Sequence, residues 1–156
     1  MGALWHFSLD FYAQPGVAPA CLRCQDEAGA DVNLILFLLW QAGSGAQFTP
    51  AEITAIDRNV SEWREQAILP LRAVRRFLKG RDREGLRDQV QAAELEAERI
   101  QQEKLSCQAR EVTEASAAEA ASTNLQAYET VLGQTLPRQA VAALLTAFNW
   151  SRNERV

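Results

Sequence analysis

The sequence is poor in the residues from which metal sites and disulfide scaffolds are built. It holds one histidine, His6, and three cysteines, Cys21, Cys24 and Cys107. A single histidine excludes a cluster of histidine metal ligands and any mechanism that needs two histidines. Cys21 and Cys24 have the spacing of a redox or metal dithiol. They fall in a predicted helix, however, and no second cysteine pair accompanies them, so two small buried residues are the simpler interpretation. We therefore expect no metal and no cofactor.

Long apolar runs are missing as well. The longest run, Leu34–Trp40, has seven residues, whereas a helix that spans a membrane needs about 20. The first residues also lack the basic start and the small-residue cleavage site of a signal peptide. Together with the odd number of cysteines, these absences favour a reducing compartment, and we expect a cytoplasmic protein without membrane contact.

An excess of positive charge is the third thing that the sequence lacks. Sixteen Lys or Arg stand against 20 Asp or Glu, and the net charge of −4 argues against bulk binding to nucleic acid. The length of 156 residues, 47% of them hydrophobic and 23% charged, is typical of one globular domain. We expect a single domain over residues 1–150 and a loose tail over residues 151–156.

Apolar residues recur at spacings of three and four along most of the chain, which is typical of helices, and strand-like alternation is nearly absent. Segment 32–41 is apolar on almost every side, and Asp31 precedes it as a good N-cap residue. A helix that is apolar all round has to be surrounded by other helices. The sequence therefore predicts an all-α bundle of about six to eight helices around a buried helix at 32–41.

Three further signals set helix boundaries. Residues 49–52 combine an N-cap threonine, a proline at the first helical position and a capping-box glutamate. Pro70 interrupts the pattern that follows, so the sequence leaves open a kinked continuation or a new helix. The longest helix is predicted over about 85–112, where apolar positions at an alternating spacing of four and three form a packing seam. Its alanines bury little area each, so the seam alone does not predict a strong coiled coil.

Several short motifs in the first half of the chain resemble a known family. They are Gln25-Asp26, Gly29, Asp31 to Leu34 and Leu39-Trp40 within segment 21–40, with Trp5, Phe7-Ser8, Tyr12, Trp63-Arg64, Pro70 to Arg72 and Arg75-Arg76 outside it. In these motifs the chain resembles a family of small proteobacterial proteins that is defined as a conserved domain of unknown function. The resemblance implies a bacterial cytoplasmic protein and supplies no activity.

Polar residues flank the predicted buried helix and form the first candidate site. Asp26, Asp31 and Asn33 could line a pocket for a polar ligand or a hard cation, because such cations take oxygen ligands. An enzyme built on the same pocket would add His6 and Arg64 to act on a small polar substrate. The simpler interpretation, which we prefer, is that Asp31 caps the helix, Asp26 ends the preceding one and Asn33 bonds a backbone group.

The charges are distributed unevenly along the chain. Residues 58–87 hold nine Arg or Lys against four acids, whereas residues 88–129 hold three bases against nine acids. The basic segment could bind nucleic acid or another anion through Arg72, Arg75 and Arg76. Alternatively, the basic helix could lie against the acidic one. We prefer this second interpretation, because the acids that follow would neutralise much of the field that a polyanion feels.

The sequence carries no catalytic, metal or nucleotide signature. An enzyme is therefore the less favoured interpretation, and the function stays open. The leading hypothesis is a small helical binding or adaptor protein, whose long or basic helix contacts another protein or a second copy of itself. A small-molecule pocket around Asp26, Asp31 and Asn33 is the second hypothesis. Anion binding through Arg72 to Arg76 is the third, and the acidic balance argues against nucleic acid as a partner.

Overall fold

Helices make up most of the chain in the computed structural model, which describes residues 2–81 and 84–153. In chain order they are α1 (Ala3–Tyr12), α2 (Val17–Ala28), α3 (Val32–Ala42), α4 (Pro50–Trp63), the π-helical segment η1 (Arg64–Ile68), α5 (Leu69–Leu78), α6 (Leu86–Ser106), α7 (Ala117–Leu132) and α8 (Arg138–Asn153). These two described ranges contain no β-strand, and the predicted all-α class is confirmed. Within them, no helix combines the length and the apolar character that crossing a bilayer requires.

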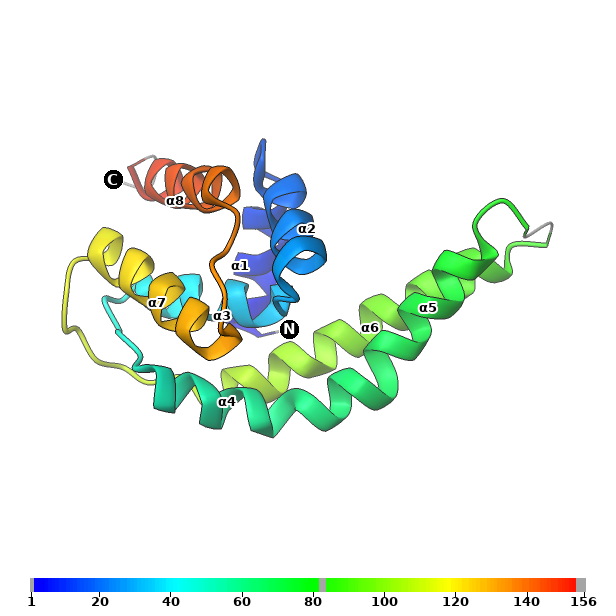
Figure 1. Cartoon of the computed structure of the whole chain (residues 1–156), viewed down its shortest axis with the longest axis horizontal. Helices are drawn as coiled ribbons and strands as arrows, with labels where there is room; N and C mark the ends of the chain where they lie inside the picture. Colours follow the sequence, from blue (N-terminus) through cyan, green and yellow to red (C-terminus); the bar gives the residue numbers. More distant parts are fainter. Residues whose placement is uncertain (1, 82–83, 154–156) are drawn as a thin grey trace.

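The central helix of the fold is α3, as its sequence predicts. Leu34 to Leu39 are at most 4% exposed, and α1, α2, α6 and α7 pack around them. Figure 1 shows α3 in cyan, enclosed by these helices. Asp31 caps the helix, because its Oδ1 accepts a hydrogen bond from the backbone N–H of Asn33 at 2.9 Å.

The chain continues through Pro70 without a break. Helix α4 starts with the predicted capping box, in which Thr49 and Glu52 each accept a hydrogen bond from the backbone N–H of the other. It passes through η1 into α5, whose first turn contains Pro70. In a π-helical turn the backbone hydrogen bonds join residues five apart instead of four. This turn comes just before Pro70, which has no backbone N–H to donate. The kinked continuation is therefore the alternative that the structure shows, and Figure 1 shows the bend.

Helix α6 is shorter than the predicted range of 85–112, because the chain after Ser106 bonds to the loop that follows α3. The backbone N–H groups of Glu114 and Ala115 both donate to the carbonyl of Gly45, at 3.1 and 3.2 Å. Gly45 has a φ of +85°, and a Cβ there would lie 2.3 Å from the carbonyl oxygen of Ala115. Only glycine fits this approach. These long-range contacts, rather than local propensity, end α6.

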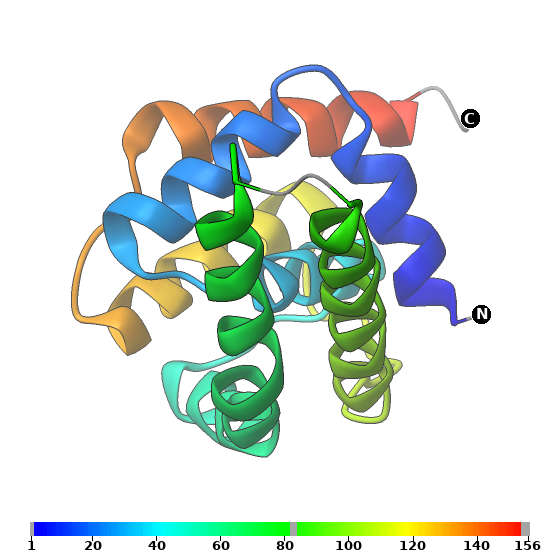
Figure 2. The same ribbon diagram turned by 90° about the vertical axis from the view of Figure 1, so that its right-hand side faces the viewer.

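Helices α5 and α6 form an antiparallel hairpin whose outer part projects from the other helices (Figure 1). Figure 2 looks along it from its tip and shows the two helices side by side, with α2 above them. We call residues 69–97 the arm and the remaining helices the body. No residue of α5 is buried, and in the arm's part of α6 only Glu94 and Ala97 are.

Helix α8 closes the body opposite the arm's base, where it packs against α2. It extends to Asn153, so residues 151–153 of the predicted loose tail are helical. Residues 154–156 of that prediction lie outside the described residues. Leu144 and Phe148 anchor α8, because both are buried in the core.

Candidate functional site

Asp31 is the centre of a polar network inside the body. Its carboxylate accepts hydrogen bonds from Arg64 at 2.9 Å and from the side-chain amide of Gln101 at 2.5 Å, besides the cap bond to Asn33. Its backbone N–H donates to the hydroxyl of Tyr128 at 2.8 Å. The side chain of Asp31 is 8% exposed. Both carboxylate oxygens are thus occupied by partners from α3, η1 and α6.

Asn33 extends this network to two glutamines of α6. Its Nδ2 donates to Gln101 at 2.9 Å, and its Oδ1 accepts from Gln102 at 3.0 Å. All three side chains are buried. Gln101 and Gln102 are not among the site residues predicted from the sequence, although two adjacent polar residues directly after the seam position Ile100 were a usable signal. Asn33 therefore bonds side chains of α6 rather than the backbone group expected from the sequence.

Arg64 fixes the start of η1 to the body through two carboxylates. It lies 2.9 Å from Asp31 and 2.7 Å from Asp57. Burial opposes the charged guanidinium, but the hydrogen bonds and charges of Asp57 and Asp31 outweigh it and raise the pKa of Arg64. Burial, with the charge of Asp31 next, also raises the pKa of Tyr128. Around Asp31 and Arg64 the network therefore consists of charge-assisted hydrogen bonds, while its far end at Gln102 leaves the buried Oε1 without a hydrogen-bond partner.

The structure brings together Asp31, Asn33 and Arg64 and places the other two candidates outside the network. Asp26 is exposed on α2 and lies 3.6 Å from Arg76. His6 is exposed on α1, and its side chain has no hydrogen bond or ion pair with the other four among the residues that the structure describes. A ligand at Asp31 would have to displace Arg64 or Gln101. The ligand-binding role of these five residues stays a prediction.

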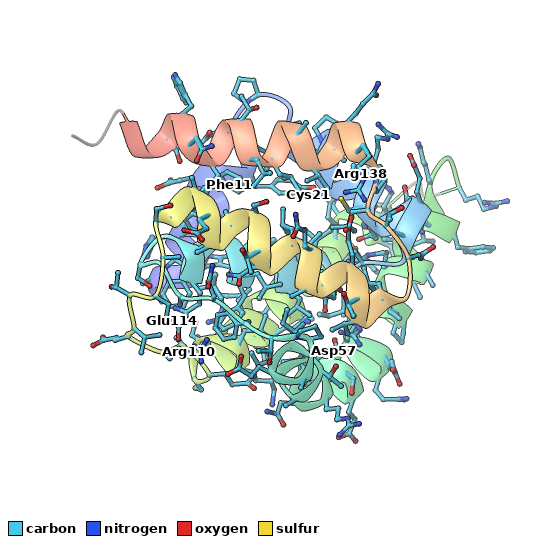
Figure 3. The ribbon with its side chains drawn as sticks, turned by 60° about the vertical axis from the view of Figure 1, so that its left-hand side comes forward. Phe11, Cys21, Asp57, Arg110, Glu114 and Arg138 are labelled. Atoms are coloured by element: carbon cyan, nitrogen blue, oxygen red, sulfur yellow. The ribbon has the colours of Figure 1, made fainter. Side chains whose placement is uncertain are left out.

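The cysteines and acids show no geometry that holds a metal. In the part of the chain that the structure describes, no three His, Cys, Asp or Glu side chains converge. Cys21 and Cys24 are buried, and Figure 3 shows Cys21 beneath α8. Burial raises the pKa of Cys21 to about 12 and that of Cys24 to about 11. Both thiols are therefore protonated at neutral pH, which makes them poor nucleophiles and poor ligands.

Two clefts lie at the end of the body away from the arm, on either side of Arg110. They measure about 560 and about 570 Å³, and Arg110 lines both. Its guanidinium lies 4.4 Å from the ring centre of Phe48 and pairs with Glu52 at 2.9 Å and Glu114 at 3.5 Å. Figure 3 shows Arg110 and Glu114 below the start of α7. Because two carboxylates neutralise Arg110, neither cleft is built around an available arginine charge. The second cleft has an aromatic wall of Phe7, Trp40 and Phe148.

The basic helix α5 lies against the acidic helix α6. Arg72 bonds Glu94 and Glu98 at 3.0 Å each and Gln25 of α2 at 2.9 Å, and Arg75 also bonds Glu94. Burial would raise the pKa of Glu94, but the hydrogen bonds from Arg75 and Arg72 outweigh it and lower the pKa. For Glu98, burial dominates and the pKa is raised. All three candidate anion-binding arginines thus face acids of the same chain, since Arg76, although exposed, lies 3.6 Å from Asp26.

The arm carries an apolar face on the side turned away from α2. At about 100° per residue, Val74 and Phe77 point away from Arg72 and Arg76, the two arginines that contact α2. Leu86, Val90 and Ala93 follow one another at spacings of four and three on α6. Val74 is 46%, Phe77 64% and Leu86 49% exposed. We call these five residues, with Pro70 and Leu78, the apolar arm face.

The apolar arm face is the outer half of the seam that the sequence predicts for the long helix. The inner half of α6 packs against α1, α3 and α4, where the seam residue Ala97 is buried, Ile100 is half-buried and Cys107 is exposed. Along the outer half of α6, α5 is the neighbouring helix (Figure 1). The seam was therefore recognisable in the sequence, but the exposure of its outer half was not.

A family model described as a protein of unknown function (DUF2390) matches residues 3–105, about two thirds of the chain. The chain belongs to the DUF2390 family. The DUF2390 match runs from the start of α1 almost to the end of α6, so it contains the arm and every residue of the Asp31 network except Tyr128. Searches of curated proteins and of solved structures found no match.

Proposed function

We propose that this DUF2390 protein is a small protein-binding module rather than an enzyme, and that the arm is its docking element. The observation that carries the proposal is the concentration of uncovered apolar side chains on the arm. Ten large hydrophobic residues are exposed in the described part of the chain, and five of them belong to the arm: Leu69, Val74, Phe77, Leu86 and Leu95. Three of these five, Val74, Phe77 and Leu86, lie on the apolar arm face. An apolar patch that gathers on one projecting element is typical of an interaction site.

The satisfied polar groups support the same proposal. The carboxylate of Asp31 has three partners, and Arg64 has two acids. A catalytic group, in contrast, needs a face that a substrate can reach. The two clefts do not reach these residues. Binding through an exposed surface therefore agrees better with the geometry than chemistry at the Asp31 network.

The proposal includes the bacterial cytoplasm as the place of action. The resemblance of the first half of the chain to small proteobacterial proteins supports a bacterial origin. The three cysteines are all free thiols, two of them buried three residues apart. Free thiols agree with a reducing compartment, since secreted proteins of this size commonly pair their cysteines.

Photo-crosslinking in living bacterial cells tests the proposal. A photoreactive phenylalanine derivative replaces Phe77 or Leu86 on the arm, and Trp150, a similarly exposed residue of α8, is the matched control position. We expect one discrete protein adduct at positions 77 and 86 and none at position 150, with the adduct identified by mass spectrometry. The same set of adducts at all three positions, or no adduct at 77 and 86, would refute the proposal.

A further inference from the structure

The second cleft lies on the body and is formed by segments that are distant in the sequence. Phe7 comes from α1, Trp40 and Gln41 from the end of α3, Arg110 from the chain after α6, and Phe148 from α8. Its volume of about 570 Å³ is within the range of about 300–1,000 Å³ that is usual for small-molecule sites. The proposed docking through the arm uses none of these residues, so the cleft is a separate part of the molecule.

Contacts with the core hold the aromatic rings of this cleft in place. Phe7 stacks on the buried Phe11 with ring centroids 5.4 Å apart, and Trp40 packs against the buried Phe37 at 6.2 Å. The third ring, Phe148, is 1% exposed. Side chains that are already ordered lose little conformational freedom when a ligand binds. A fixed aromatic wall of this kind favours a flat ring, which can stack on it or pack against it edge to face.

Gln41 brings a hydrogen-bond donor to the cleft. Its side chain is 5% exposed, and its Oε1 accepts a hydrogen bond from the backbone N–H of Arg110 at 2.8 Å. Because that bond requires an oxygen, it fixes which end of the amide is the NH2 group, Nε2. Within the described residues Nε2 has no acceptor, yet it is not one of the partnerless atoms that are sealed from solvent. Since Gln41 lines the second cleft and not the first, Nε2 is reached through the second cleft.

The charges around the cleft favour an uncharged ligand. Among the described residues that line it, Arg110 and Glu111 are the charged ones, so their charges balance. Arg110 is already paired with Glu52 and Glu114, and a carboxylate or phosphate would therefore find no uncommitted cation. An organic cation would bring its charge close to Arg110 and would offer Nε2 of Gln41 nothing to donate to.

We propose that the second cleft binds an uncharged heteroaromatic molecule. Its ring packs on the wall of Phe7, Trp40 and Phe148, and a ring nitrogen or carbonyl oxygen at its edge accepts a hydrogen bond from Nε2 of Gln41. A purely apolar ligand would enclose this donor without a partner, which costs free energy. The phenyl and indole rings of a peptide fit the wall but lack the acceptor. The site goes beyond the proposed function, because it serves a small molecule and acts without the arm.

NMR titration of the full chain with two matched probes tests the proposal. The probes are 1-methylbenzimidazole and 1-methylindole at pH 8, where both are uncharged. They have the same fused bicyclic shape, and only the first carries a ring nitrogen that accepts a hydrogen bond. We expect 1-methylbenzimidazole to bind about threefold to tenfold more tightly, the effect of one neutral hydrogen bond. It should shift the side-chain amide signal of Gln41 and give nuclear Overhauser contacts to Phe7 and Trp40.

Two outcomes of the titration would overturn the proposal. In the first, 1-methylindole binds as tightly as 1-methylbenzimidazole, so the cleft is an apolar pocket without use for the donor. In the second, neither probe shifts signals of the cleft up to millimolar concentration. Both outcomes are read on the wild-type chain, so they do not depend on the folding of any variant.

Gln41→Glu tests the role of the donor itself. Glutamate keeps an oxygen that can accept from the backbone N–H of Arg110 and replaces the NH2 group with a second oxygen, so 1-methylbenzimidazole should lose its advantage over 1-methylindole. Gln47→Glu is the matched control, because Gln47 is a half-buried glutamine of the first cleft, and it should leave both affinities unchanged. Phe7→Leu should weaken both probes together. An advantage that persists in a folded Gln41→Glu variant contradicts the assignment of Gln41.

Discussion

The Asp31 network and the apolar arm face are both candidate functional parts in the sequence, but they differ in how accessible their side chains are in the structure. Every oxygen of the Asp31 carboxylate has a partner, and the side chain is nearly inaccessible. In the apolar arm face, Val74, Phe77 and Leu86 are exposed. Polar residues beside a buried helix can thus serve the fold, while part of a plain helical seam stays accessible to solvent.

Asp31→Ala should have the largest effect on stability. The change removes the cap of α3, leaves the side-chain amide of the buried Gln101 without its acceptor, and takes from the half-buried Arg64 one of its two acids, since Asp57 remains. A lost cap costs about 1 kcal/mol and a buried polar group without a partner about 1–3 kcal/mol, so the unfolding free energy should fall by about 2–4 kcal/mol. Chemical denaturation measures the loss. Asp26→Ala, which breaks only the exposed pair with Arg76, should cost about 0–1 kcal/mol, and equal losses for the two variants would show that the network is not structural.

Asn33→Ala should come next, with a loss of about 1–3 kcal/mol, because it leaves polar groups of Gln101 and Gln102 buried without partners. The matched control is Asn59→Ala. Asn59 bonds Gln108 at 2.6 Å on the surface, where water can replace the lost bond, so its loss should stay within about 0.5 kcal/mol. Thermal and chemical denaturation of both variants check the difference.

Two glutamates one turn apart on α6 should respond to pH with opposite signs. The folded-state pKa of Glu94 is lowered, so its contribution is present above the unfolded pKa of about 4.3 and lost as pH falls through the folded pKa. The folded-state pKa of Glu98 is raised, so its charge costs stability at neutral pH, and that cost disappears on acidification.

Neutral amides at these two positions provide the measurement. Glu94→Gln should destabilise the protein at pH 7 by about 1–3 kcal/mol, since two arginines lose a charged acceptor. Glu98→Gln should leave stability unchanged or raise it at pH 7. Melting temperatures of both variants between pH 4 and pH 8 show the signs, and a large loss for Glu98→Gln would contradict the account.

Phe77→Asp should have the smallest effect on stability and a large effect on docking through the arm. The ring is mostly exposed, with the guanidinium of Arg81 4.8 Å from its centre, so the substitution should change the unfolding free energy by no more than about 0.5 kcal/mol. Chemical denaturation measures the stability, and crosslinking from position 86 measures docking. A loss of several kcal/mol would mean that the arm face is part of the core.

Local signals in the sequence were sufficient for the parts of the fold that depend on one segment. The apolar run after Asp31 predicts a capped, buried α3, and residues 49–52 predict the start of α4. The end of α6 depends instead on Gly45, about 60 residues earlier in the chain. Local propensity carries no information on such a contact, so the predicted helix ran too far.

The candidate sites also divide into features with a local signal in the sequence and features that depend on contacts between distant residues. Asp31 was recognisable as a cap, but its partners Gln101 and Tyr128 are 70 and 97 residues away. The pairing of basic and acidic helices was one of two alternatives in the sequence, and only packing could separate them. Nor does a helical seam reveal whether its partner belongs to the same chain. What covers a surface is a tertiary property, and it decided which residues are available for binding.

The most direct test compares three proteins that carry the photoreactive residue at position 86 and are otherwise wild type, Asp31→Ala or Phe77→Asp. Crosslinking is carried out well below their melting temperatures, with unfolding free energies determined in parallel. We predict that Asp31→Ala loses stability but still forms the adduct, whereas Phe77→Asp keeps its stability and loses the adduct. If the two substitutions weaken stability and crosslinking together, or if position 86 gives no adduct, the separation of a structural network from a docking arm is contradicted.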